Sequence, residues 1–178
     1  MSAISRYEQI PLIVETIMKI QPRKILDIGA GFGMLGFLTK AYIDLWQRKW
    51  FKKNHITTIH ALDAYTDYYT FQYDLYDKII KINVLDFNDF DNYDTIYCFD
   101  LLQHLKKDKA KTILNKLEKH TGNVLLSIPL GNGWIRNHPD PYESHLSEWE
   151  IKELVDYGFN LLKEYSIPDG RKIGLFLK

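Results

Sequence analysis

Short apolar segments alternate with longer amphipathic segments along nearly the whole chain. The apolar segments are rich in Ile, Val and Leu, and the segments between them repeat their apolar residues at helical spacing. This alternation predicts an α/β fold, in which a parallel sheet carries helices on both faces. The predicted strands are 24–28, 57–62, 78–83, 95–99, 123–128, 160–165 and 172–177. The predicted helices are 7–19, a long helix from 34 toward 51, 107–119 and 147–158.

The last two predicted strands are separated by a short turn that contains Pro168, Asp169 and Gly170. Such spacing permits a hairpin, so one C-terminal strand should run antiparallel to the rest of the sheet. We therefore expect a Rossmann-like, doubly wound, mainly parallel sheet of seven strands. The 178 residues contain no repeat and no Gly/Ser/Pro linker, and they are too few for two ordinary domains. A single domain over 1–178 is expected.

Charge and cysteine content exclude several classes of protein. Lys and Arg balance Asp and Glu at 23 each, whereas a dedicated nucleic-acid-binding protein usually has a basic excess. The single cysteine, Cys98, cannot form an internal disulfide or a cysteine-rich metal site, and its place in a predicted strand suggests a core residue. Glu8 and Glu15 interrupt the first twenty residues, which are neither a signal peptide nor a membrane span. We expect a cytoplasmic protein with no membrane partner and no metal.

A glycine-rich turn, Gly29-Ala30-Gly31-Phe32-Gly33, follows the first predicted strand directly and opens the long helix. Glycines at such a turn adopt backbone torsions closed to other residues and let a ligand approach the main chain. The pattern is G-x-G-x-G, whereas dinucleotide folds use G-x-G-x-x-G to cradle a pyrophosphate. The turn predicts a binding site for a ligand without a pyrophosphate, or it is only a tight connection.

Acidic residues recur where the later predicted strands end. Asp63 ends the second strand, Asp86 lies just beyond the third, and Asp100 lies just beyond the fourth. In doubly wound sheets ligands bind outside the carboxyl ends of the strands, so these side chains should converge on one crevice. Each acid alone is more often a turn or cap residue. Together with the glycines they predict a binding site.

At this point the sequence resembles the class I S-adenosylmethionine-dependent methyltransferases over nearly its whole length. The turn from Asp27 to Gly33 is similar to that family's first motif, and Asp63 is similar to its ribose-binding acid. The segment Phe99 to Leu105 resembles the family's stretch after strand four, with Gln103 where a Glu often stands. The resemblance implies S-adenosylmethionine as the cofactor, with Asp86 and Phe87 at the adenine. The residues that it assigns to the cofactor are Asp27, Gly29, Ala30, Gly31, Gly33, Asp63, Ala64, Asp86, Phe87 and Asp100.

Four further segments resemble a bacterial and phage subgroup of these methyltransferases. They are Asp44–Trp46, Ala61–Ala64, Asp74–Asp77 and Pro141–Trp149. The physical reading agrees with the cofactor, because S-adenosylmethionine has ribose hydroxyls but no pyrophosphate. Thirty residues separate Gly33 from Asp63, compared with about twenty in nicotinamide-binding folds. The leading hypothesis is methyl transfer to a small-molecule or sugar acceptor, the sugar resting on the subgroup alone.

Methyl transfer to a hydroxyl acceptor requires a general base. The predicted irregular segment 130–147 leaves the carboxyl edge of the sheet and is rich in titratable groups. Its candidates are His138, Asp140, Tyr142, Glu143 and His145, and His104 follows the fourth strand. Alternatively, His145 is a structural histidine, His104 only caps or packs, or His138 and His145 bind a metal.

Two basic stretches leave other functions open. Arg48, Lys49, Lys52 and Lys53 alternate with Trp46, Trp50 and Phe51, and six lysines populate 106–119. Basic residues with aromatics can hold an RNA or a phosphorylated glycan. More commonly, such residues form the solvated face of a helix whose apolar face packs inward. The alternatives to the leading hypothesis are a nucleic-acid or protein methyltransferase and a non-catalytic cofactor-binding module. Asp100-Leu-Leu-Gln103 stands where an Asn-Pro-Pro-Tyr motif would indicate base methylation.

Overall fold

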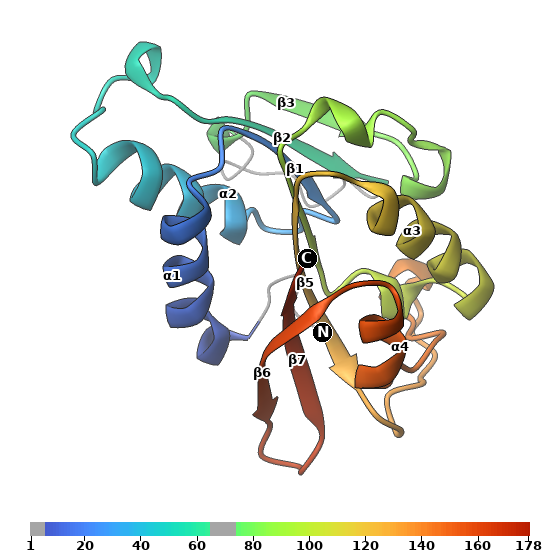
Figure 1. Ribbon diagram of the computed structural model, residues 1–178. Coiled ribbons are helices and arrows are strands. Elements are labelled where there is room, and N and C mark those ends of the chain that lie inside the picture. The colour runs from blue at the N-terminus through green and yellow to red at the C-terminus, as the bar shows by residue number, and fades with distance from the viewer. Residues whose placement is uncertain (1–5, 65–73) are drawn as a thin grey trace.

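In the computed structural model, which describes residues 6–64 and 74–178, seven strands form one central sheet (Figure 1). They are β1 (Lys24–Ile28), β2 (Thr58–Asp63), β3 (Lys78–Lys81), β4 (Thr95–Phe99), β5 (Asn123–Leu130), β6 (Asn160–Ser166) and β7 (Lys172–Leu177). Their order across the sheet is β3-β2-β1-β4-β5-β7-β6. The pairs among β1 to β5 are parallel, and β7 runs antiparallel to both of its neighbours. The predicted Rossmann-like sheet is confirmed.

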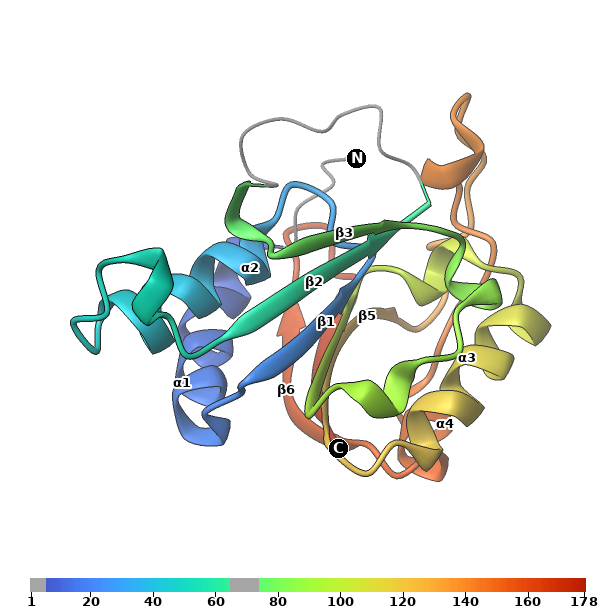
Figure 2. The same cartoon turned by 90° about the horizontal axis from the view of Figure 1, so that it is seen from above.

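Helices cover both faces of this sheet. In the described part of the chain the α-helices are α1 (Ile10–Ile20), α2 (Met34–Thr39), α3 (Lys107–Lys119) and α4 (Ile151–Asp156). Both α1 and α2 lie on one face, while α3 and α4 lie on the other (Figures 1 and 2). None of these described helices is long and apolar enough to cross a bilayer.

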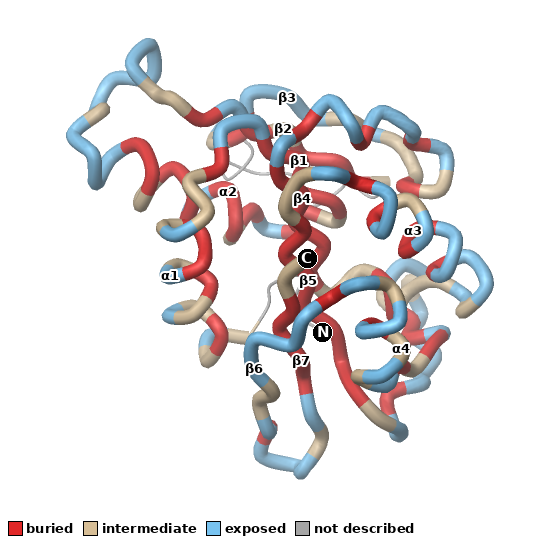
Figure 3. The backbone as a smooth tube through the Cα atoms, in the orientation of Figure 1, coloured by how far each residue is buried: buried red, intermediate tan, exposed pale blue. Residues whose placement is uncertain are grey.

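The strands separate two apolar cores, because successive side chains of a strand point to opposite faces. Along β1, Ile25 packs into the core under α1 and α2, and Leu26 and Ile28 pack into the core under α3 and α4. Figure 3 shows this buried centre running through the sheet. Helix α3 contributes its apolar face at helical spacing through Ala110, Ile113, Leu114 and Leu117.

Two lysines of α3 take structural roles. Lys107 Nζ donates to Glu153 Oε2 at 2.8 Å and lies 3.6 Å from the centre of the Trp149 ring. Lys116 Nζ donates to the carbonyl of Phe87 at 2.8 Å. For this helix, the interpretation of an inward apolar face with a charged outer face is confirmed.

The predicted long helix ends earlier than expected. Helix α2 continues as a π-helix over Lys40–Leu45, and the helical path stops near Trp46 instead of reaching Phe51. Asp44 causes this, because its fully buried carboxylate accepts the backbone N–H of Ile56 at 2.7 Å and turns the chain back. Residues 45–56 then project from the body as an arm, drawn in cyan in Figures 1 and 2.

Three other predicted boundaries were also wrong, and one of them is the end of β5, which lies at Leu130 instead of 128. Strand β3 ends at Lys81, two residues before the predicted end. Helix α4 begins at Ile151, because Glu150 is its N-cap and forms a capping box with Glu153. Ser147, the predicted helix start, is instead buried, and its hydroxyl donates to the carbonyl of Leu102 at 3.1 Å.

Candidate active site

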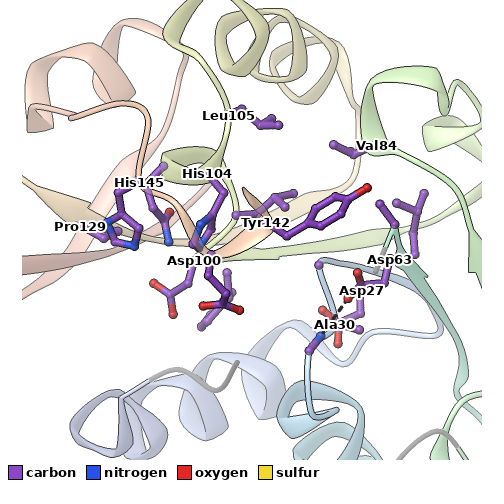
Figure 4. Close-up of a pocket in the computed structure, with 18 of the residues that line it drawn as sticks. Asp27, Ala30, Asp63, Val84, Asp100, His104, Leu105, Pro129, Tyr142 and His145 are labelled. Atoms are coloured by element: carbon purple, nitrogen blue, oxygen red, sulfur yellow. Dashed lines mark hydrogen bonds between the residues drawn. The ribbon is translucent and has the colours of Figure 1, made fainter. Parts of the chain in front are cut away.

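A cavity of about 520 Å³ opens at the carboxyl ends of the parallel strands (Figure 4). One end holds Asp27, Ala30 and Asp63, and the other holds His104 and His145, with Tyr142 extending between them. The remaining predicted residues that line it are Gly29, Gly31, Ala64, Asp100 and Glu143. The lining therefore joins the glycine turn, the strand-end acids and the segment after β5.

The glycine turn is held against the neighbouring strand ends. Gly29, Gly31 and Gly33 have φ angles of 71°, 53° and 79°, a region that side chains strain. The N–H of Gly29 donates to the carbonyl of Leu62 at 2.8 Å, and the N–H of Gly31 donates to Asp63 Oδ2 at 3.3 Å. Gly33 is the N-cap of α2 and lies outside the cavity lining. The turn thus aligns its backbone with the carboxylate that ends β2.

Asp27 is a buried acid beneath this turn. Its side chain is 1% exposed, and the hydroxyl of Tyr76 donates to its Oδ2 at 2.6 Å. The pKa of Asp27 is raised to about 7, because burial and, to a smaller extent, the negative charge of Asp63 raise it by more than the hydrogen bond from Tyr76 lowers it. A Cβ atom on Gly36 would lie 2.7 Å from the Tyr76 ring, so this glycine makes room for the tyrosine.

The third strand places different residues in the cavity from those the sequence predicted. Asp86 is exposed, and Phe87 is buried in the core, where its ring packs edge-on against Phe90 at 5.1 Å. The cavity is lined instead by Asn83 and Val84. Because β3 ends at Lys81, Asn83 is close to the strand end, where ligand contacts occur in this sheet type. The predicted adenine pair, Asp86 and Phe87, therefore lies outside the cavity lining.

Asp100 leaves β4 in an unusual conformation. Its φ angle is 48°, which is uncommon for a residue other than glycine, and its N–H donates to the carbonyl of Ser127 at 3.0 Å. Strained backbone of this kind is typical of functional sites. The turn directs the chain back across the cavity toward His104.

His104 is held with one ring nitrogen engaged. Its Nδ1 lies 3.0 Å from the carbonyl oxygen of Ser144, which can only accept, so Nδ1 carries the proton. Burial lowers the pKa of His104, and this outweighs the opposite effects of the Ser144 carbonyl, Glu143 and the backbone of Asp100. The ring is therefore neutral at pH 7 and keeps an unprotonated Nε2, as a general base requires.

His145, the leading candidate base from the sequence, has a different environment. It is 1% exposed, and among the described residues neither of its ring nitrogens has a hydrogen-bond partner. Burial lowers its pKa to about 4, assisted by positive charge from His104, Arg136 and Arg171. Its ring packs edge-on against His104 at 4.8 Å and stacks on Trp134 at 6.1 Å. This geometry favours the structural alternative, in which His145 supports His104.

The other candidates of this segment separate into two groups. Glu143 and Tyr142 line the cavity on a 3₁₀-helix over Pro141–Glu143, which Asp140 caps by accepting the N–H of Tyr142 at 2.9 Å. His138 is exposed outside the cavity lining, and its Nδ1 accepts the N–H of Asp140 at 3.1 Å. Within residues 6–64 and 74–178, no three His, Cys, Asp or Glu side chains gather as a metal site would require.

Comparison with solved structures identifies the fold. The structure of 1,6-didemethyltoxoflavin-N1-methyltransferase from Burkholderia thailandensis, with 1,6-didemethyltoxoflavin and S-adenosylhomocysteine bound, has a TM-score of 0.65 at 14% identity. The match covers 94% of this chain and 75% of the chain of that methyltransferase. The N-terminal domain of EvdMO1, crystallised in the presence of S-adenosylhomocysteine and D-fucose, has a TM-score of 0.66 at 13% identity, over 98% and 83% of the two chains. The chain has the class I methyltransferase fold.

A methyltransferase domain of bacterial CtHen1-C agrees with this assignment. Its TM-score is 0.56 at 18% identity, and the match covers 94% of this chain and 95% of that chain. Neither a protein-family model nor a curated protein sequence matches the chain.

Within this methyltransferase fold, the sequence reasoning missed the residues that support the site. Tyr76 reaches Asp27 from 49 positions away, and no spacing rule connects the two. Trp134 contacts both the guanidinium of Arg171, 4.1 Å from its ring centre, and the ring of His145. Only Asn83 had a usable signal, since it stood at the end of a predicted strand.

The pKa of His145 predicts a specific acid sensitivity. An unfolded histidine takes up a proton as the pH falls below about 6.5, whereas folded His145 stays neutral until about pH 4. Folding stability should therefore decrease between pH 6.5 and 4, by on the order of 2 kcal/mol from this residue. His145→Phe keeps an aromatic ring that cannot take up a proton. Its free energy of unfolding should therefore increase relative to that of the wild type as the pH falls from 6.5 to 4. Urea unfolding at pH 7 and 4.5 measures the difference, and parallel pH profiles would contradict the assignment.

Proposed function

We propose that this chain is an S-adenosylmethionine-dependent methyltransferase, built as a single domain, that acts on a small-molecule or sugar acceptor. One observation carries the proposal: the glycine turn, Asp27 and Asp63 meet at one end of a cavity whose other end holds an oriented, neutral His104. The fold supports it, as do the neighbouring structures that contain S-adenosylhomocysteine.

The cofactor end fits the chemistry of S-adenosylmethionine. The carboxylate of Asp63 offers oxygens to ribose hydroxyls, and Asn83 and Val84 are suited to the adenine edge. The buried carboxyl of Asp27 and the backbone of Gly29 to Gly31 are suited to the polar methionine end. When bound, the cofactor supplies a methyl group on a positively charged sulfur, with a neutral thioether as the leaving group.

The acceptor end supplies positioning and a base. His104 Nε2 takes the proton of an acceptor hydroxyl, while the bond from Nδ1 to Ser144 holds the ring in the required tautomer. His145 and Trp134 pack behind it and limit its rotation. Tyr142 and Glu143 line the space beside the acceptor. The leaving group departs as a neutral thioether and needs no acid, so alignment of the nucleophile is the main remaining requirement.

The two structures with small ligands guide the acceptor class. One contains 1,6-didemethyltoxoflavin and the other was crystallised in the presence of D-fucose. The cavity of about 520 Å³ is in the range of small-molecule sites. A sugar or another small hydroxylated compound therefore remains the favoured acceptor.

Calorimetry on one substitution tests the cofactor end. Asp63→Ala should weaken binding of S-adenosylhomocysteine roughly 10- to 150-fold, because it removes charge-assisted hydrogen bonds worth about 1.5–3 kcal/mol. The wild type should bind S-adenosylhomocysteine more tightly than NAD.

Asp86→Ala is the matched control, since Asp86 is exposed away from the cavity, and its affinity should equal that of the wild type. An unchanged affinity in a folded Asp63→Ala variant would make Asp63 a turn residue only. Tighter binding of NAD would reject the cofactor.

A further inference from the structure

The arm, residues 45–56, presents large aromatic side chains that the proposed reaction does not use. Trp46, Trp50 and Phe51 are 71%, 68% and 65% exposed. The interpretation of an inward-packed apolar face, confirmed for α3, is therefore wrong for this stretch. Three large aromatic side chains exposed within six residues of one segment are uncommon on a protein surface that has no partner.

The same arm concentrates positive charge. It contains Arg48, Lys49, Lys52 and Lys53 and no acidic residue, in a chain whose net charge is zero. Lys49 Nζ donates to the amide oxygen of Gln47 at 3.0 Å, and among the described residues none of the four cations forms an ion pair. The charge of Arg48, Lys49 and Lys53 is thus available to an anionic partner, and Lys52 adds to it while also lowering the pKa of Asp77.

The base of the arm is fixed. The buried carboxylate of Asp44 accepts the N–H groups of Ile56 and Thr57 at 2.7 and 3.3 Å. Gln47 Nε2 donates to Gln21 Oε1 at the end of α1 at 3.1 Å. An arm anchored at both ends presents its side chains with little ordering cost on binding.

The arm and the cavity lie at opposite ends of the parallel strands. The arm leads into the start of β2, where the N–H of Thr58 donates to the carbonyl of Arg23 just before β1 (Figure 2). The cavity lies at the other ends of the same strands, about 20 Å away for a strand of this length. The arm is therefore a separate surface from the acceptor site.

We propose that the arm docks the protein on an anionic membrane surface, with the cavity facing away from the bilayer. Tryptophan rings favour the membrane–water interface, and lysine and arginine are attracted to anionic lipid headgroups. The arm projects from the body, as Figures 1 and 2 show, and its first residue, Leu45, is 43% exposed. Single-stranded nucleic acid is bound in a groove with stacking rings, so a projecting arm with an aliphatic side chain favours the membrane. This revises the expectation of no membrane partner.

Vesicle binding of the whole chain tests the proposal. The wild type should co-sediment with vesicles of phosphatidylcholine and phosphatidylglycerol at least tenfold more strongly than with phosphatidylcholine alone, and high salt should weaken this. Trp46 and Trp50 are exposed whereas Trp134 and Trp149 are buried, so the fluorescence of the arm should shift to shorter wavelength on binding. Lys52→Glu with Lys53→Glu, and Trp46→Ser with Trp50→Ser, should each reduce vesicle binding at least tenfold.

Tyr7→Ser is the matched control, because Tyr7 is an aromatic residue that is 74% exposed but lies outside the arm. It directly follows Arg6, which lines the cavity. It should bind vesicles like the wild type. The arm variants should keep their affinity for S-adenosylhomocysteine, which shows that they are folded and separates this test from that of the proposed function. Absent or lipid-independent binding, or arm variants that bind normally, would overturn the proposal. The proposal would also be overturned if the wild type bound polyuridylate but no vesicles, or if it self-associated through Trp50 without binding lipid.

Discussion

His104→Gln should lower methyl-transfer turnover about 10²- to 10⁴-fold, while the affinity for S-adenosylhomocysteine stays within a factor of about two. The glutamine side chain has a similar length and can still donate to the carbonyl of Ser144, but it cannot accept a proton from the acceptor. Single-turnover rates and calorimetry on the same preparation measure the two quantities.

His138→Gln is the control for this substitution. His138 is exposed outside the cavity, so its variant should retain wild-type turnover. Because burial lowers the pKa of His104, the wild-type rate should be independent of pH above about 6.5 and fall only at lower pH. A loss of less than about threefold in His104→Gln would remove the base role, as expected for an amine acceptor that attacks unaided.

Asp27→Asn should weaken binding of S-adenosylhomocysteine on the order of 10- to 100-fold and yet leave the protein at least as stable at pH 8. The folded pKa of Asp27 is about 7, above the ordinary value of 3.8, so the folded state holds a proton that the unfolded state has lost. The stability that Asp27 contributes is present below pH 4 and decreases as the pH rises to about 7. Asparagine keeps the acceptor oxygen for Tyr76 without a buried charge.

The pH dependence of binding gives a second readout. If ionised Asp27 pairs with the cofactor's ammonium, wild-type affinity should fall as the pH drops below about 7, and Asp27→Asn should lack this dependence. Tyr76→Phe keeps the ring beside Gly36 but removes the hydrogen bond that lowers the pKa, so its profile should move to higher pH. An asparagine variant with wild-type affinity, or with lower stability at pH 8, would contradict this role.

Most of the fold could be predicted because it depends on periodicity. The buried residues of α3 repeat at helical spacing, whereas β4 is a short continuous run of buried residues, as expected of a parallel strand covered on both faces. The end of the long helix could not be predicted, since it depends on Asp44 and Ile56, which lie twelve positions apart. The end of β3 was also predicted wrongly, because a short edge strand has few buried residues to mark where it ends.

The cofactor end of the site was easier to predict than the acceptor end. Gly29 and Asp63 follow from the rule that ligands bind at the carboxyl ends of strands, which needs only the order of strands along the chain. The choice between His104 and His145 depends on which ring nitrogen meets a carbonyl and how deeply each ring is buried. Those are properties of packing between distant segments, and composition alone carries no signal for them.

Transfer of a labelled methyl group tests the central claim most directly. The wild type is incubated with S-adenosylmethionine labelled on its methyl group and with a fractionated cell extract, and each fraction is assayed for label. We predict that label enters a small-molecule or glycan fraction with the wild type and at least 10²-fold more slowly with His104→Gln. Label confined to nucleic acid or protein, or no transfer to any fraction by protein that binds S-adenosylhomocysteine, would contradict the account.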